Sequence, residues 1–244
     1  MGGLVGAALG PPLLRVGYFS AEAPSPTPPE GWERIRFGKN DASTRYDLVR
    51  ADSAVVLRAR SENGASGLIT RPTVDLEEHP ILEWRWKVDA LPDEADITEK
   101  TADDAAARLY VTFDYDGLGL IDRLKLMLLR RVGYAEAPSR ALNYLWASHH
   151  ERGVVQPSAY TDQIMMIPVR SGSTRVGQWV HERRNVLEDY RRAFGEAPPP
   201  VNGVALMTDT DNTGGRATAL YGDIIFRARR GEDAVRPAAT GGGD

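Results

Sequence analysis

The side chains that could do chemistry in this sequence are mainly carboxylates, gathered in two segments. Residues 89–116 hold nine carboxylates against two basic side chains, and Asp103 and Asp104 are adjacent at the start of a predicted strand. A carboxylate pair can act as acid and base on a polysaccharide, and carboxylate oxygens also bind hard cations. Asp103, Asp104 and Asp114 are therefore the candidate catalytic residues of a hydrolase or lyase. A charge-dense, solvated loop is the alternative interpretation.

The second acidic segment, residues 208–214, has the sequence that opens a calcium loop. The twelfth position counted from Asp209 is Leu220 instead of the bidentate glutamate of an EF-hand, so the segment is not an EF-hand. A turn whose Asp and Asn side chains hydrogen-bond their own backbone explains the same residues without a metal. We favour the turn and retain Asp209 and Asp211 as candidate ligands of a structural calcium ion; no other cofactor is expected.

Composition and the remaining motifs exclude several classes of protein. The 244 residues include no cysteine, which removes disulfides, thiolate metal sites and cysteine nucleophiles. A net charge of −4 provides no basic field for nucleic acid, and no apolar run is long enough to span a bilayer. His181 and Glu182 begin like a zinc-protease helix, but Asn185 stands where the second histidine is required. The sequence also lacks a P-loop and the G-x-S-x-G of a serine hydrolase.

The elements that must position these residues are mostly strands. Short segments with period-2 alternation recur at a spacing typical of all-β domains, and only residues 120–128 and 186–194 have helical periodicity. The second of these helices ends at Gly195, in the position that favours glycine. The pattern predicts an all-β fold, an antiparallel two-sheet sandwich of jelly-roll type with one or two inserted helices. The predicted strands are 13–19, 44–50, 54–60, 81–89, 107–115, 142–146, 163–170, 201–208 and 218–226.

Alternation assigns each strand a core face and an outer face. In residues 82–88 the core face is Leu82, Trp84, Trp86 and Val88, and near residue 221 we expect Leu220, Ile224 and Phe226 to point inward. If the strands share one sheet, their second faces pool into a single polar surface. That surface consists of Glu83, Arg85, Arg108, Tyr110, Asp114, Tyr221 and Asp223.

The pooled surface suggests carbohydrate binding. Aromatic rings can meet the apolar faces of pyranose rings, and charged bidentate groups can meet paired hydroxyls. On this hypothesis Arg108→Ala abolishes the binding of a glycan or cell-envelope polymer and leaves folding intact. A solvated outer face with cross-strand ion pairs explains the same residues, so an interaction scaffold without a ligand site ranks second. The hydrolase or lyase ranks third.

Ordered sequence blocks across residues 14–228 also resemble a known family. The blocks include Val16-Gly17-Tyr18-Phe19-Ser20, Gly31-Trp32, Val56-Leu57-Arg58-Ala59, Leu82-Glu83-Trp84-Arg85-Trp86-Lys87-Val88, Asp103-Asp104-Ala105-Ala106-Ala107-Arg108, Asn143-Tyr144-Leu145-Trp146, Asp189-Tyr190-Arg191-Arg192-Ala193-Phe194-Gly195-Glu196, Thr208-Asp209-Thr210-Asp211-Asn212-Thr213 and Tyr221-Gly222-Asp223-Ile224. Together they resemble the bacterial domain-of-unknown-function family 3047, which has no assigned activity.

The resemblance implies an exported protein of Gram-negative bacteria with a jelly-roll sandwich similar to galactose-binding-like and carbohydrate-binding modules. It therefore implies a periplasmic or secreted location; the leader lacks a basic start, which leaves a cytoplasmic location as the alternative. Residues 1–12 are interpreted as a leader or disordered tail, 13–229 as one β-sandwich domain and 230–244 as a disordered tail.

Overall fold

Two hydrogen-bonded sheets make up most of the structure, a computed structural model that describes residues 13–36, 44–92, 94–119 and 138–230. Three sequence predictions lie outside these ranges: the leader at 1–12, the helix at 120–128 and the tail beyond residue 230. No helix in the described ranges has the length and apolarity needed to cross a membrane.

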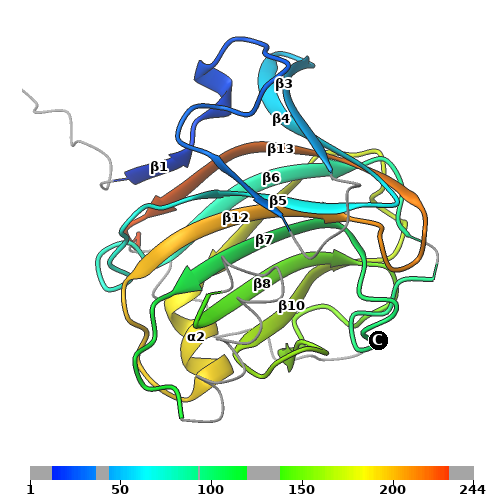
Figure 1. Ribbon diagram of the computed structural model, residues 1–244. Helices are drawn as coiled ribbons and strands as arrows, with labels where there is room; N and C mark the ends of the chain where they lie inside the picture. The colour runs from blue at the N-terminus through cyan, green and yellow to red at the C-terminus, as the bar shows by residue number, and fades with distance from the viewer. Residues whose placement is uncertain (1–12, 37–43, 93, 120–137, 231–244) are drawn as a thin grey trace, which may run out of the picture.

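The first sheet, here called sheet A, has the strand order β11-β6-β13-β4-β3. The five strands are β11 (Val180–Asn185), β6 (Ile81–Val88), β13 (Arg216–Arg227), β4 (Ala54–Glu62) and β3 (Arg45–Ala51), all paired antiparallel. The first half of β13 pairs with β4, and its second half pairs with β1 (Leu13–Gly17). In Figure 1, β1 lies beside the second half of β13. The short 3-10 helix η1 (Phe19–Ala21) follows β1 in the chain.

The second sheet, sheet B, has the order β2-β5-β12-β7-β8-β10-β9. Its strands are β2 (Glu33–Arg36), β5 (Ala65–Thr70), β12 (Val201–Asp209), β7 (Ala105–Phe113), β8 (Arg140–Ala147), β10 (Ile164–Ser171) and β9 (Gln156–Pro157). Each neighbouring pair is antiparallel except β8 and β10, which run parallel. The predicted two-sheet sandwich is confirmed, with this one parallel pair as an exception to its antiparallel pattern.

The hydrophobic core fills the space between the sheets and is rich in aromatic side chains. Trp84 and Trp86 of β6 contact each other edge to face, and Trp86 also lies near Trp146 of β8. Trp84 meets Tyr144 from the opposite sheet, with ring centroids 5.5 Å apart. Such offset aromatic pairs stabilise a core beyond the area that they bury. The predicted core face of β6 is therefore confirmed.

One helix of the described residues, α2 (Val186–Phe194), follows β11 directly. Asn185 caps its first turn, accepting a hydrogen bond from the Glu188 backbone nitrogen at 3.2 Å, as asparagine does at many helix starts. The helix ends at Gly195, whose φ of 74° lies in the left-handed region. The predicted helix and its glycine stop are both confirmed, and Figure 1 shows α2 at one end of the sandwich.

Candidate ligand-binding groove

A groove of about 590 Å³ crosses the outer face of sheet A. It runs over β11, β6 and β13, and Ser20 of η1 stands at its edge. Three of the predicted binding residues, Glu83, Arg85 and Asp223, line it together. They meet because β6 and β13 are neighbours in the sheet, so that their outward side chains share one face.

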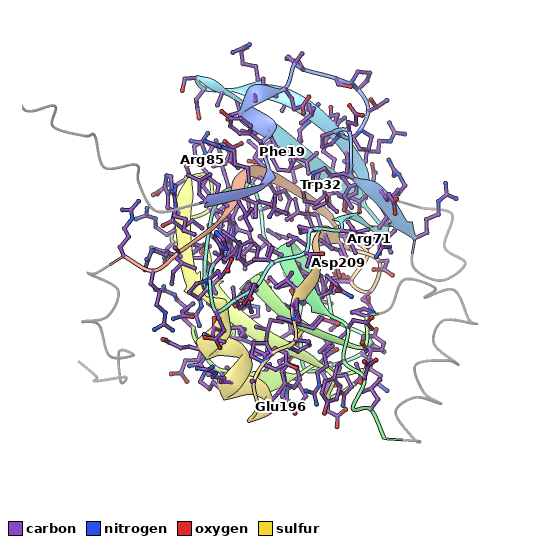
Figure 2. All side chains as sticks on the ribbon, turned by 90° about the vertical axis from the view of Figure 1, so that its left-hand side faces the viewer. Phe19, Trp32, Arg71, Arg85, Glu196 and Asp209 are labelled. Carbon is purple, nitrogen blue, oxygen red and sulfur yellow. The ribbon has the colours of Figure 1, made fainter. Side chains whose placement is uncertain are left out.

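Arg85 is the most distinctive side chain of the groove. Its guanidinium carbon lies 4.6 Å from the ring centroid of Trp179, a cation–π contact. The indole is held in turn by Asp52, in the turn between β3 and β4, which accepts a hydrogen bond from Trp179 Nε1 at 2.7 Å. Arg85 itself has no hydrogen-bond or ion-pair partner among the described residues. Its donor nitrogens therefore remain available to a ligand. Figure 2 labels Arg85 in the upper part of the molecule.

A bulge in β13 makes room for Arg85. Tyr221 pairs with Trp86 and Ile224 with Trp84, so β13 takes three steps where β6 takes two. A Cβ on Gly222 would lie 2.5 Å from Arg85 Cγ and 2.6 Å from its Nε. Only glycine lets the arginine stem lie this close to the bulged backbone.

The same bulge overturns the predicted orientation of Tyr221. Before the bulge, Ala217, Ala219 and Tyr221 face the core, and after it Ile224 and Phe226 do. Tyr221 is 1% exposed and its hydroxyl donates to the Met207 carbonyl oxygen at 2.7 Å. The extra residue shifts the alternation by one position, so Tyr221 points inward while Asp223 points outward.

The two carboxylates that line the outer face of the groove already have partners. Glu83 accepts hydrogen bonds from Arg183 of β11 at 3.2 Å and from Arg227 of β13, one on each carboxylate oxygen. Asp223 accepts two from Ser20, through the backbone nitrogen at 2.9 Å and the hydroxyl at 2.6 Å. These bonds join three strands and η1 across the groove floor and edge.

The rest of the predicted polar surface lies elsewhere, which corrects the idea of one pooled face. β7 belongs to sheet B, so its outward side chains face away from those of β6 and β13. Tyr110 packs against Ile35, Ile69 and Ala205 on that second outer face. Asp114 follows the last residue of β7 and accepts a hydrogen bond from Ser139 Oγ at 3.3 Å.

Arg108 is buried, with 1% exposure, instead of lying on a binding surface. Its Nε donates to Asp209 Oδ1 at 3.0 Å, and a terminal nitrogen donates to Asp103 Oδ1 at 2.7 Å. These contacts raise the pKa of the Arg108 guanidinium against the opposing effect of burial. Arg108 is thus the centre of a structural ion-pair network.

The candidate catalytic carboxylates do not form a pair that reaches substrate. Asp104 precedes β7, and Asp114 follows it. The nine residues of this strand, with a rise of about 3.3 Å per residue, place the two carboxylates roughly 30 Å apart. Two-carboxylate glycosidases need separations below about 10 Å. Asp103 is bound to Arg108, and Asp104 accepts from the backbone nitrogens of Asn212 and Thr213 at 3.2 and 2.7 Å.

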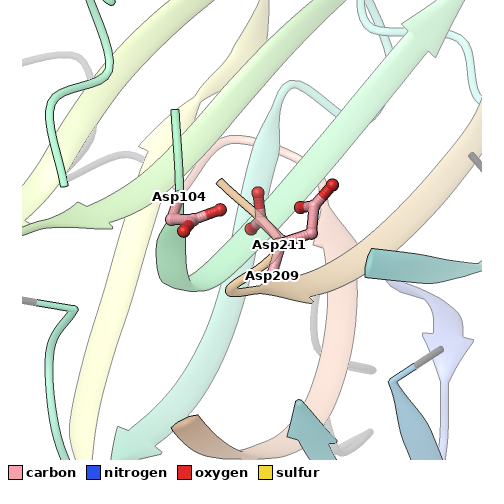
Figure 3. Close-up of side chains that lie close together, drawn as sticks. All are labelled: Asp104, Asp209 and Asp211. Carbon is pink, nitrogen blue, oxygen red and sulfur yellow. The ribbon is translucent and has the colours of Figure 1, made fainter. Parts of the chain in front are cut away.

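Asp104 instead joins Asp209 and Asp211 in an acidic cluster whose carboxylate oxygens lie within 4.8 Å of one another (Figure 3). Asp209 is 2% exposed, and burial together with the nearby Asp103 and Asp104 raises its pKa to about 8, against the lowering effect of Arg108. Partial desolvation and the charge of Asp104 also raise the pKa of Asp211, although Asp211 is the exposed member of the cluster. The predicted Asx-rich turn is therefore anchored from outside by Asp104, a contact that residue spacing alone did not reveal.

The calcium ligands Asp209 and Asp211 remain a prediction, and this cluster supplies the oxygen donors that calcium takes. If the ion binds, millimolar Ca²⁺ should raise the melting temperature, and Asp211→Asn should abolish the rise with little effect on the calcium-free protein, because Asp211 is exposed. Thermal unfolding of both proteins with and without Ca²⁺ measures this, with Asp116→Asn as a control outside the cluster. An equal rise in Asp211→Asn would contradict the prediction.

Sequence reasoning missed the groove residues outside β6 and β13. His181 and Arg183 lie on β11, a segment that we had compared only with a zinc-protease helix. The sequence of β11, Val-His-Glu-Arg-Arg-Asn, contains a single apolar residue, and its second inward side chain is the charged Glu182, so apolar alternation gave no signal of this strand. Trp179, which is half-buried, contacts Arg85 from outside these strands.

The strand pairing and the groove define a two-sheet β-sandwich with a polar cleft on one outer face. The family model described as "Protein of unknown function (DUF3047)" matches residues 30–225, and the chain belongs to this family. The resemblance seen in the sequence is thereby confirmed. No curated protein matches the chain in sequence.

Several solved structures are similar to this chain at low identity. One is a variant of CBM29-2, from family 29 of the carbohydrate binding modules, at 10% identity and a TM-score of 0.40, with 93% of this chain and 99% of that one covered. The ENZbleach xylanase is 8% identical with a TM-score of 0.43, covering 92% and 90%. The K3 adhesin domain of Lys-gingipain from Porphyromonas gingivalis is 10% identical with a TM-score of 0.37, covering 87% and 98%.

Proposed function

We propose that this protein is a non-catalytic carbohydrate-binding module that holds a glycan or a related cell-envelope polymer in the groove on sheet A. The observation that carries the proposal is the arrangement of Arg85, which lies against the Trp179 indole and whose donor nitrogens have no partner among the residues that the structure describes. A rigid, planar donor group beside an open cleft is suited to paired hydroxyls, which a pyranose offers on adjacent carbons.

The size and lining of the groove support a small polar ligand. Its volume of about 590 Å³ is within the range of about 300–1,000 Å³ found for small-ligand sites. Hydroxyl, imidazole, carboxylate and guanidinium groups line it, contributed by Ser20, His181, Asp223 and Arg85 among others. Most of these groups come from strands and not from long loops, which favours a fixed geometry.

The state of the groove carboxylates favours binding over catalysis. Glu83 and Asp223 each accept two hydrogen bonds from protein groups. Glu182, the third carboxylate at the groove, points toward the core and binds Arg170 at 2.6 Å. A general acid and base need carboxyl groups that reach substrate, and these three are occupied within the protein.

Glycan-array binding tests the proposal. We expect the wild-type protein to bind a defined set of glycans and Arg85→Gln to lose the signal, because glutamine cannot reproduce the planar fork. Arg216→Gln is the matched control: it removes an arginine from the same sheet, and Arg216 is 80% exposed and paired with Glu62 away from the groove. Undiminished binding by folded Arg85→Gln would contradict the proposal, and an array with no bound glycan would favour the interaction scaffold.

A further inference from the structure

We infer that the glycan of the proposed function is acidic, and that Arg85 binds its anionic substituent, a carboxylate as in a uronic acid or a sulfate or phosphate ester. The inference rests on the proposed function and adds the charge class of the ligand. It follows from a count of charges and partners on the groove face, because a charge in a partly buried site needs a counter-charge.

Three guanidinium groups line the outward side of the groove against two carboxylates. Arg85, Arg183 and Arg227 provide the positive charges, and Glu83 and Asp223 provide the negative ones. Glu182 does not enter this count, because its carboxylate faces the core, is 7% exposed and is neutralised by Arg170. Among the described side chains that line this outward face, guanidinium groups therefore outnumber carboxylates by one.

Of these three guanidinium groups, only that of Arg85 has no carboxylate bonded to it among the described residues. Glu83 has both oxygens occupied by Arg183 and Arg227, which compensates that carboxylate twice over. Asp223 has both oxygens bonded to Ser20, so neither is directed to Arg85. Arg85 lies over the face of the Trp179 indole, which attracts a cation electrostatically. This contact uses the face of the guanidinium and leaves the N–H donors in the guanidinium plane free to bind a ligand.

The position of Arg85 is also fixed in advance. Gly222 leaves the space that the arginine stem occupies, and Trp179 lies against the guanidinium. A donor group held in place before binding loses less conformational entropy when the ligand arrives. A guanidinium fork is geometrically matched to two oxygens of a carboxylate, a sulfate or a phosphate.

The test compares ligands that differ only in charge. Titration calorimetry would use galacturonan oligosaccharides and the same oligosaccharides as neutral methyl esters, with a sulfated galactan as a third arm to separate sulfate from carboxylate. A glycan array containing acidic and neutral sugars provides the wider survey. We expect the bound sugars to be acidic, and binding to weaken as salt increases. A difference in affinity between the galacturonan and the sulfated galactan identifies which anionic group the groove binds.

Variants of Arg85 assign the effect to this residue. We expect Arg85→Gln to lower affinity for the preferred acidic ligand by about 10- to 100-fold, the range for a charge-assisted hydrogen bond, and to remove the preference over its neutral counterpart. Arg85→Lys keeps the charge but not the fork, so it should retain part of the preference. Arg216→Gln, outside the groove, should match the wild type.

The outcomes separate this inference from the proposed function. Binding of neutral glycans with no gain from an acidic group would overturn the inference and leave the binding module standing. An acidic preference that survives in both Arg85 variants would also overturn it. Binding of no sugar on the array would overturn the proposed function itself. Melting temperatures of the variants confirm that each result comes from a folded protein.

Discussion

Replacing Arg108 by alanine is expected to lower the free energy of unfolding by about 3–5 kcal/mol, the usual cost of removing one partner of a buried ion pair. Arg108 is 1% exposed and bonds Asp209 and Asp103, so alanine leaves a cavity and deprives two carboxylates of their donors. Chemical denaturation of the variant and the wild type measures the difference. This expectation reverses the one from sequence, in which the same substitution abolished binding and spared the fold.

A surface arginine provides the control for that experiment. Arg216 pairs with Glu62 at the protein surface, and alanine there should change the free energy of unfolding by no more than about 1 kcal/mol. Arg108→Met tests how much of the lost stability comes from the missing charge and how much from the cavity, since methionine restores much of the buried volume. If Arg108→Ala kept its stability and lost glycan binding, Arg108 would belong to a ligand site after all.

The free energy of unfolding should also fall as pH rises from about 4 to about 8, through the titration of Asp209. In the folded protein its pKa is raised to about 8, chiefly by burial, against an ordinary value of 3.8 in the unfolded chain. Between these values the folded state holds one proton more than the unfolded state, so rising pH favours unfolding. The contribution is at most about 1.4 kcal/mol per pH unit, and it levels off above pH 8.

Asp209→Asn isolates this effect from the other carboxylates. The amide resembles the protonated acid at every pH, so the variant should gain stability relative to the wild type as pH rises from 5 to about 8. Denaturation curves recorded in EDTA at several pH values, which keep divalent cations out of the acidic cluster, give this difference directly. A difference that stays constant over the range would mean that Asp209 is ionised beside Arg108 in the folded protein throughout.

Local patterns in the sequence were sufficient for most elements. The alternation in Leu82–Val88 identified both the strand and its buried face, because a buried sheet face demands an apolar residue at every second position. The helix over Val186–Phe194 was identified by its apolar spacing and by Gly195, whose left-handed conformation few other residues adopt. These features depend on neighbours within a few residues of one another.

Features that depend on distant pairing were not predictable in this way. Alternation sorts the side chains of β7 onto two faces, but nothing in that strand indicates that it lies in the sheet opposite β6. Arg108 has the parity of an outward residue and is buried because Asp103 and Asp209 enclose it. Asp223 and Glu83 were grouped correctly because their strands happen to be neighbours.

The bulge at Gly222 makes β13 a single strand built of two halves with opposite phase. Removing Gly222 would give β13 an unbroken alternation in which Tyr221, Ile224 and Phe226 all still face the core. Removing Ile225 instead would turn Phe226 and Arg227 to the opposite faces, because no bulge lies beyond it to absorb the change. The bulge therefore lets β13 hold one residue more than its neighbour while the same apolar side chains stay buried.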